Sequence, residues 1–221
     1  LLLAELGDAA GAEQAFREVL ATRPASASAR FNVGMAALQR GRQVEAEGYF
    51  QAAIEAEPGH GLAHFQLGLS RQAAGDAVAA AAHFEAALAA RPADPEVLLA
   101  AGVLDAMRGN SERAKARVSA AAQLRPGWPN ADAALASMLI GDPAASEADR
   151  QQALSLAERA ATAAPGNAAF IEILAETLAA SGARDRAIAV ARDGAALAER
   201  TGDARAAARL RQRLASWEGQ R

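Results

Sequence analysis

The sequence predicts an all-α protein built from repeated antiparallel helix pairs, an arrangement called an α-solenoid. The first observation is composition, since hydrophobic residues make up 52% of the 221 residues but aromatic residues only 4%. Alanine, which is abundant, is the strongest helix former and fills little volume, so its helices must pack closely. The second observation is an internal repeat of 34 residues, the length of a helix–turn–helix unit.

Five columns of residues recur at this spacing, and their agreement in one register indicates a true repeat. They consist of two series of glycine and one each of alanine, phenylalanine and proline. The columns are Gly7, Gly41, Gly75 and Gly109; Ala12, Ala46, Ala80 and Ala114; Phe16, Phe50 and Phe84, followed by Val118; Pro24, Pro58, Pro92 and Pro126; and Gly34, Gly68 and Gly102.

Each column has a physical reason, which the third unit illustrates. Gly68 lies within the first helix, where glycine costs about 1 kcal/mol relative to alanine, and close approach of the second helix would offset that cost. Gly75 suits the left-handed residue that ends a helix. Ala80 is small enough for the point where the two helices cross, and Phe84 would cover that contact. Pro92 marks the end of the second helix, because proline cannot continue it.

These motifs resemble the tetratricopeptide repeat, whose pattern is W-x2-L-G-x2-Y…G…A-x3-F…A…P. The third unit reads His64-x2-Leu67-Gly68-x2-Arg71, followed by Gly75, Ala80, Phe84, Ala87 and Pro92. The chain departs from the pattern where the family has large aromatic residues in the first helix. Arg30, His64 and Leu98 replace the tryptophan, and Ala37, Arg71 and Asp105 replace the tyrosine.

The resemblance implies a right-handed α-solenoid with about five full units, a partial first unit and a C-terminal capping helix, all in one domain. The fifth unit is longer, because 39 residues separate Pro126 from Pro165. We place the insertion at 141–143, between helices near 130–140 and 147–163. The predicted units are 1–24 (partial), 25–58, 59–92, 93–126, 127–165 and 166–201, with the capping helix at 203–217. Because Leu1 falls within a helix of the partial unit, we expect a C-terminal fragment of a longer, bacterial-type protein.

In the family, the first helix of each pair lines a concave groove that binds peptides. The resemblance therefore implies a peptide-binding groove formed by Phe31, Asn32, Met35, Leu62, Phe65, Gln66, Leu69, Leu99 and Val103. Glu96, Glu172 and Glu176 occupy equivalent positions in later units. The basic clamp by which some members hold a peptide carboxylate is not matched, because Leu62, Glu96 and Ala100 stand at its positions.

Two readings remain open for the groove phenylalanines, Phe31 and Phe65. They either pack between neighbouring helices, as apolar residues usually do, or form an open apolar surface for a peptide. Asn32 and Gln66 lie in equivalent positions and are suited to hydrogen-bond a peptide backbone.

The sequence predicts no enzyme activity, cofactor or metal site in this chain. It contains no cysteine, which excludes disulfides and thiol chemistry, and it has no phosphate-binding loop or nucleophile motif. His60 and His64 have the i, i+4 spacing of a metal-binding pair, but no third ligand is evident, so surface positions are expected. The net charge of −3 argues against nucleic acid as a partner. No apolar run is long enough to span a membrane.

The C-terminal segment differs in charge from the rest of the chain. Residues 184–221 contain nine arginines and five acidic residues. Arg205, Arg209 and Arg213 recur every four residues on the predicted capping helix. They either form the polar outer face of a solenoid end or bind an acidic partner or an anionic membrane.

These observations favour a protein–protein interaction scaffold that binds a peptide or protein segment in the groove. One alternative is a C-terminal accessory domain that recruits partners for a larger enzyme, such as a membrane glycosyltransferase-like protein. Another is a structural spacer that self-assembles. The sequence carries no targeting signal and does not distinguish a cytoplasmic from a periplasmic location.

Overall fold

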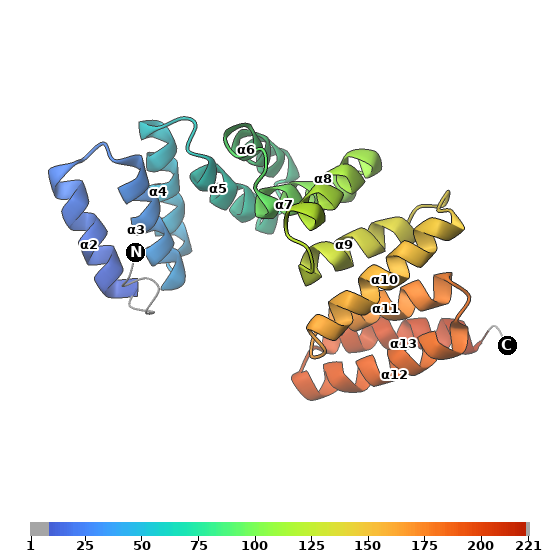
Figure 1. Cartoon of the computed structure of the whole chain (residues 1–221). Coiled ribbons are helices and arrows are strands. Elements are labelled where there is room, and N and C mark those ends of the chain that lie inside the picture. The colour runs from blue at the N-terminus through green and yellow to red at the C-terminus, as the bar shows by residue number, and fades with distance from the viewer. Residues whose placement is uncertain (1–8, 220–221) are drawn as a thin grey trace. The chain divides into compact units, whose positions relative to one another are not determined.

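The computed structural model describes residues 9–219, and in that range it is all-α, with twelve helices and no strand (Figure 1). The predicted all-α helical-repeat fold is therefore confirmed. In chain order the helices are α2 (Ala9–Thr22), α3 (Ala27–Gln39), α4 (Gln43–Ala56), α5 (Gly61–Ala73), α6 (Ala77–Ala90), α7 (Pro95–Met107), α8 (Ser111–Leu124), α9 (Pro129–Ile140), α10 (Glu147–Ala163), α11 (Ala168–Ala180), α12 (Arg184–Thr201) and α13 (Ala204–Glu218).

The helices form two compact units, one ending at Leu104 and the other beginning at Asp105, so the boundary falls within α7. In the first unit, α3 packs against α4 and α5 against α6. In the second unit, α9 packs against α10, α11 against α12, and α12 against α13. The single continuous solenoid stays a prediction.

Glycines end the first helix of several pairs, as their column predicts. Gly41 and Gly75 follow α3 and α5 with φ values of 73° and 79°, the left-handed conformation that a side chain disfavours. Each turn then leads directly into the second helix of the pair. At the start of α6, Asp76 accepts a hydrogen bond from the Ala79 N–H at 2.9 Å, which caps the helix.

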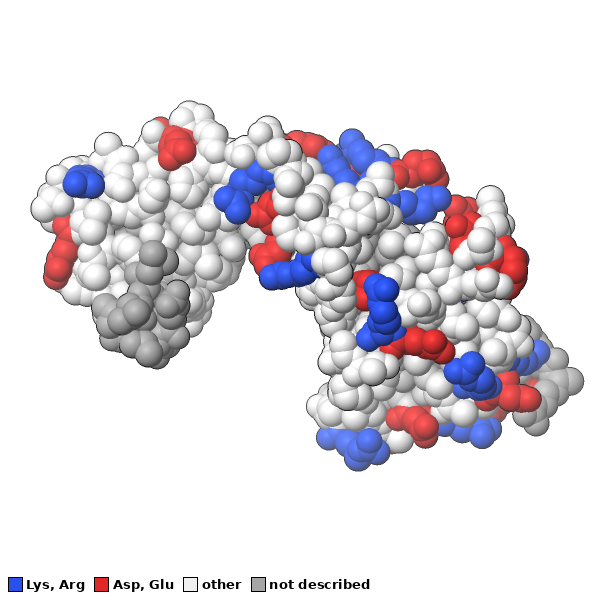
Figure 2. All heavy atoms as spheres, viewed as in Figure 1, with Lys and Arg blue, Asp and Glu red and all other residues white. Residues whose placement is uncertain are grey.

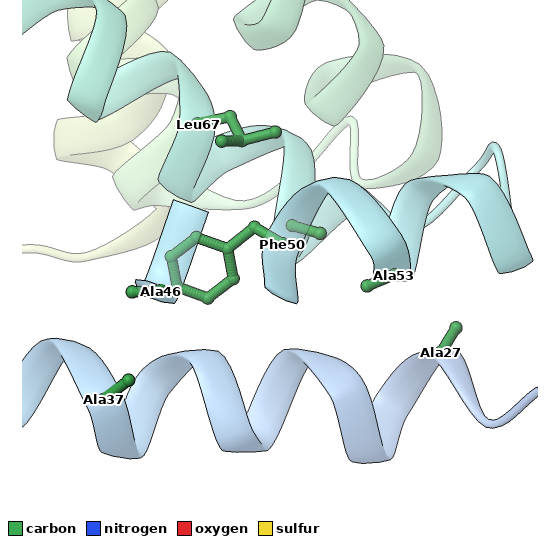
Figure 3. Packing of buried hydrophobic residues seen from close by; sticks show 7 residues of the cluster. Ala27, Ala37, Ala46, Phe50, Ala53 and Leu67 are labelled. Atoms are coloured by element: carbon green, nitrogen blue, oxygen red, sulfur yellow. The ribbon is translucent and has the colours of Figure 1, made fainter. Parts of the chain in front are cut away.

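The core of each hairpin in the first unit is a phenylalanine ring pressed against a glycine. A Cβ atom built on Gly34 would lie 2.7 Å from Cε1 of Phe50, and one on Gly68 would lie 2.5 Å from Cε1 of Phe84. Both rings are buried. Figure 3 shows Phe50 with the buried alanines of α3 and α4 and with Leu67 of α5. The cost of glycine within a helix is thus offset by packing that no larger residue would permit.

The insertion in the fifth unit is a short connection between α9 and α10, at the position that the sequence predicts. Asp142 in this connection accepts a hydrogen bond from Lys115 of α8 at 2.9 Å. The next helix begins with a capping box, in which Ser146 and Asp149 each accept a hydrogen bond from the other's backbone N–H. The insertion is therefore an ordered loop fixed at both ends. Within residues 9–219, no helix combines the length and the apolar character that crossing a bilayer requires.

Candidate functional site

The nine predicted groove residues all lie in the first unit, on the first helix of successive pairs. Three come from α3, four from α5 and two from α7. Eight of them keep part of their surface accessible, and Phe65 is the exception at 8% exposure. The residues that remain accessible are Phe31, Asn32, Met35, Leu62, Gln66, Leu69, Leu99 and Val103.

The two groove phenylalanines have different surroundings. Phe65 belongs to the core, where its ring centroid lies 6.0 Å from that of Phe84. Phe31 is half-buried, with its centroid 5.6 Å from that of Phe50 and 5.2 Å from that of His60. Packing between helices therefore describes Phe65, while Phe31 packs and also presents a surface. Replacing both phenylalanines with alanine would lower the stability of the fold, because Phe65 is part of the core. Weaker peptide binding by such a variant would therefore not show that the two rings contact the peptide.

Asn32 and Gln66 are equivalent residues in successive repeats and are both half-buried. Within residues 9–219, neither side chain forms a hydrogen bond or any other polar contact. Each amide keeps donors and an acceptor for a ligand. Leu69, three residues after Gln66, is the most exposed apolar side chain of the set at 36%. Amide and apolar groups are therefore both available on this face.

Most arginines of the capping helix form ion pairs with glutamates of the same chain. Arg209 pairs with Glu172 at 2.8 Å, and Arg213 pairs with Glu176 at 2.5 Å. Both glutamates lie on α11, where the resemblance implied groove positions. Arg205 is exposed and has no such partner in the described residues. Figure 2 shows positive and negative side chains side by side on the visible face of the second unit. This arrangement favours a polar end face over an anion-binding stripe.

Sequence reasoning missed the buried carboxylates that hold helix pairs together. Asp105 is 3% exposed and accepts hydrogen bonds from Arg113 at 2.5 Å and Arg117 at 2.6 Å, both on α8. Asp132 is 1% exposed and is held by two hydrogen bonds from Arg159 on α10. In the sequence, Asp105 stands out only as a departure from tyrosine in its column. For Asp105 the available signal was an arginine one or two turns into the next helix. Arg159, the partner of Asp132, lies about three turns into α10 and gave no such signal.

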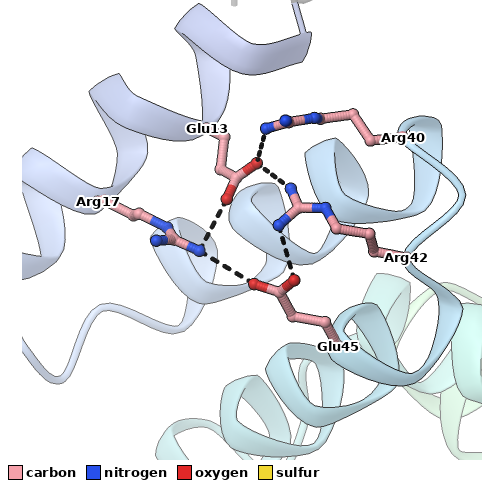
Figure 4. Close-up of polar contacts among 5 residues, drawn as sticks. All are labelled: Glu13, Arg17, Arg40, Arg42 and Glu45. Atoms are coloured by element: carbon pink, nitrogen blue, oxygen red, sulfur yellow. Dashed lines mark hydrogen bonds and ion pairs between the residues drawn. The ribbon is translucent and has the colours of Figure 1, made fainter.

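A third buried carboxylate, Glu13 of α2, is the centre of the network in Figure 4. It is paired with Arg17 at 2.7 Å, with Arg40 at 2.9 Å and with Arg42. Glu45 of α4 pairs with Arg17 and Arg42 and closes the network. Burial opposes ionisation of Glu13, but the hydrogen bonds from Arg42 and Arg40 outweigh it and lower the pKa below 4.5. The network joins α2 to the α3–α4 hairpin.

We expect Glu13→Gln to destabilise the protein by about 2 kcal/mol at pH 7, because charged hydrogen bonds are lost. Since the folded pKa is lowered, the Glu13 carboxylate stabilises the fold above the unfolded pKa, and this contribution is lost as pH falls through the folded value. The difference between wild type and variant should therefore shrink below pH 4.5. Urea denaturation at pH 7 and pH 3.5 measures it, with Glu18→Gln on the exposed side of α2 as the control. A difference that is equal at both pH values would contradict the prediction.

His60 and His64, which have the i, i+4 spacing of a metal-binding pair, make different contacts in the structure. His60 caps α5, because its Nδ1 accepts a hydrogen bond from the Ala63 N–H at 3.2 Å. His64 instead contacts His83 of α6, with 3.1 Å between their Nδ1 atoms. Burial, and after it the nearby His64 and Arg71, lower the pKa of His83, which favours its neutral ring. Residue spacing alone does not connect His83 with His64, because the two lie on different helices.

Comparisons with known proteins agree with this architecture. Two family models, both described as tetratricopeptide repeat, match residues 1–61 and 72–138. No curated protein sequence gives a significant match. Among solved structures, YrrB, described as a tetratricopeptide-repeat protein with an unusual peptide-binding site, is 17% identical with a TM-score of 0.69. The alignment covers 91% of this chain and 100% of the YrrB chain.

Two further structures are similar at comparable levels of identity. The Cut9–Hcn1 hetero-tetramer of the APC/C aligns at 20% identity with a TM-score of 0.71, over 97% of this chain and 42% of the matched chain. PilF of Pseudomonas aeruginosa aligns at 21% identity with a TM-score of 0.62, over 88% of this chain and 93% of its own. At these identities the likeness concerns the fold.

Proposed function

Because this chain is a tetratricopeptide-repeat protein, we propose that it is a protein-interaction scaffold that holds a peptide segment against α3, α5 and α7. The observation that carries the proposal is the pair of unengaged amides, Asn32 and Gln66. Half-buried amides without an intramolecular partner lose hydrogen bonds to water when a ligand covers them, unless the ligand replaces those bonds. A peptide backbone does so, since it offers both N–H and C=O groups in regular order.

The chemistry of this face also indicates the kind of segment. None of the nine residues is ionisable, and the accessible apolar groups include Phe31, Leu62, Leu69 and Val103. A ligand with apolar side chains, held through its backbone, fits this surface better than an acidic or basic one. The affinity should therefore change little with ionic strength, because screening acts on charge pairs. YrrB, which is described as having a peptide-binding site, has a similar fold and supports the proposal by analogy.

We expect the variant with Asn32→Ala and Gln66→Ala to bind peptides at least 10-fold more weakly, at unchanged melting temperature, because two unpaired hydrogen-bonding groups are removed. Peptides would be selected from a random phage-displayed library on the wild-type chain and measured by fluorescence polarisation. Gln51→Ala is the matched control, since Gln51 is an exposed amide on α4, the second helix of its pair.

Four results would count against the proposal. The library could give no peptide above background, the control could weaken binding as much as the double variant, or binding could survive removal of both amides. A drop in melting temperature of the double variant would also contradict it, because these side chains contact no polar group of the described chain.

A further inference from the structure

The contact between His64 and His83 has features that neither helix packing nor peptide binding explains. The rings come from the two helices of one hairpin, with centroids 5.4 Å apart and planes inclined at 44°. Their Nδ1 atoms are 3.1 Å apart. Both side chains are half-buried, so the pair can be reached from solvent. His64 stands where the repeat pattern has a tryptophan, so a polar pair replaces an apolar contact.

The hydrogen bonds fix the orientation of His64. Its Nε2 lies 2.9 Å from the carbonyl oxygen of Pro58. A carbonyl oxygen can only accept, so Nε2 carries the proton, and in the neutral ring Nδ1 is left with its lone pair. This lone pair faces Nδ1 of His83 and accepts a hydrogen bond from its N–H across the 3.1 Å contact. A histidine whose far N–H is held by a backbone carbonyl, so that its other nitrogen presents a lone pair, has the usual orientation of a metal-binding histidine.

The separation of the two Nδ1 atoms suits a shared metal ion. An ion about 2.05 Å from each nitrogen would subtend an angle of about 100° across the 3.1 Å gap. That value lies between the angles of square-planar and tetrahedral coordination, the geometries of copper or nickel and of zinc. An ion would take the place of the proton between the two Nδ1 atoms, and His83 would then carry its proton on Nε2, so that both Nδ1 lone pairs face the ion.

We propose that His64 and His83 together bind a divalent transition-metal ion, Zn²⁺, Ni²⁺ or Cu²⁺, through their two Nδ1 atoms. Within residues 9–219, no group of three histidine, cysteine or carboxylate side chains forms a metal site. Water or a side chain of a bound partner therefore fills the other coordination positions. The site is weaker than a four-ligand structural zinc site and selects for imidazole-preferring ions over Mg²⁺ and Ca²⁺.

The surrounding charges are compatible with a bound cation. Arg71 is the cationic side chain that acts on His83, and it is paired with Glu47 of α4 at 3.4 Å, which offsets its charge. A bound ion would cross-link α5 to α6. The hairpin so stabilised carries Leu62, Gln66 and Leu69 of the candidate peptide surface. Metal would then raise the stability of this hairpin by binding only its folded form.

The test uses the chain of residues 1–221 without an affinity tag, after removal of metal with EDTA and dialysis. Calorimetric titration with ZnCl₂, NiCl₂ and MgCl₂ should give one saturable site for zinc and nickel and none for magnesium. His64→Gln and His83→Gln should each weaken binding at least 10-fold. His60→Asn is the matched control, since asparagine preserves the helix cap, and it should bind as the wild type does.

A second measurement does not depend on the variants folding. In ¹⁵N-detected imidazole spectra of the wild type, zinc should shift the Nδ1 signals of His64 and His83 and leave those of His60 unchanged. No saturable binding, equal loss in His60→Asn, or shifts confined to His60 would each overturn the proposal. Because these readouts need no peptide, their failure would leave the proposed peptide-binding function unaffected.

Discussion

Replacing Phe84 with alanine is expected to lower the free energy of unfolding by about 3–5 kcal/mol, the range for a fully buried phenylalanine. The ring is 1% exposed and fills the space above Gly68, between α5 and α6. Urea denaturation followed by far-UV circular dichroism measures the loss.

The same contact makes a sharper prediction for Gly68. Gly68→Ala should destabilise the wild type by about 1–3 kcal/mol, because the new Cβ would be 2.5 Å from the Phe84 ring and would overpack the core. In the Phe84→Ala background the ring is absent, and the same change should be neutral or stabilising, since alanine favours helix by up to about 1 kcal/mol.

Gly48 of α4 provides the control, because a Cβ built there meets nothing within 4 Å. Gly48→Ala should stabilise the protein by up to about 1 kcal/mol in both backgrounds. If Gly68→Ala destabilises to the same extent with and without the Phe84 ring, then the ring is not the reason for glycine at this position.

Asp105→Ala is expected to destabilise the second unit by about 3 kcal/mol, because it leaves the guanidinium groups of Arg113 and Arg117 without the carboxylate they share. The effect should lie at the lower end for a buried ion pair, since Arg113 is about half exposed and can turn toward water. Arg113→Gln alone should cost less than about 1 kcal/mol for the same reason.

A double-mutant cycle between Asp105 and Arg117 separates their interaction from the other effects of each change. Arg117 is the better buried of the two arginines, with its side chain 16% exposed. We expect a coupling energy above 1 kcal/mol from the urea denaturation of both single variants and the double variant. A coupling near zero would mean that Asp105 is buried for reasons other than this ion pair.

The periodic part of this fold could be predicted because glycine, alanine and phenylalanine columns report on backbone geometry. The left-handed turn at Gly75 and the close approach at Gly68 follow from the absence of a side chain, and both are observed. The insertion after α9 was likewise located, since it breaks the spacing of prolines. In each case a single residue type recurs at one position of the repeat, and one structural requirement explains its presence there.

Departures from the repeat pattern could not be interpreted in the same way. Arg30, in the tryptophan position, donates a hydrogen bond to the carbonyl oxygen of Ala52 at 2.8 Å, and Asp105, in the tyrosine position, joins an ion-pair network. Both partners lie on the neighbouring helix, and their identity depends on side-chain directions that spacing does not reveal. His83 is a similar case, because nothing in its own helix suggests a contact with His64.

The sequence predicts which residues belong to the candidate binding face, but it does not predict which of their side chains are exposed. Phe31 and Phe65 occupy equivalent places in their repeats, yet their exposures differ, with Phe65 fully in the core. The difference arises from their neighbours, since Phe65 packs against the tilted ring of Phe84 within a cluster that includes Val97 and Ala101 of α7. Assigning a peptide to this face remains a proposal.

The glycine–phenylalanine contact also bears on how such a chain changes during evolution. Gly34 with Phe50 and Gly68 with Phe84 are both separated by 16 residues, so each contact is encoded within one 34-residue unit. A duplication or deletion of one unit would copy or remove a complete contact and leave every other one intact. The genetic unit of inheritance therefore coincides with the structural unit, and length can change in whole steps without a new core having to arise.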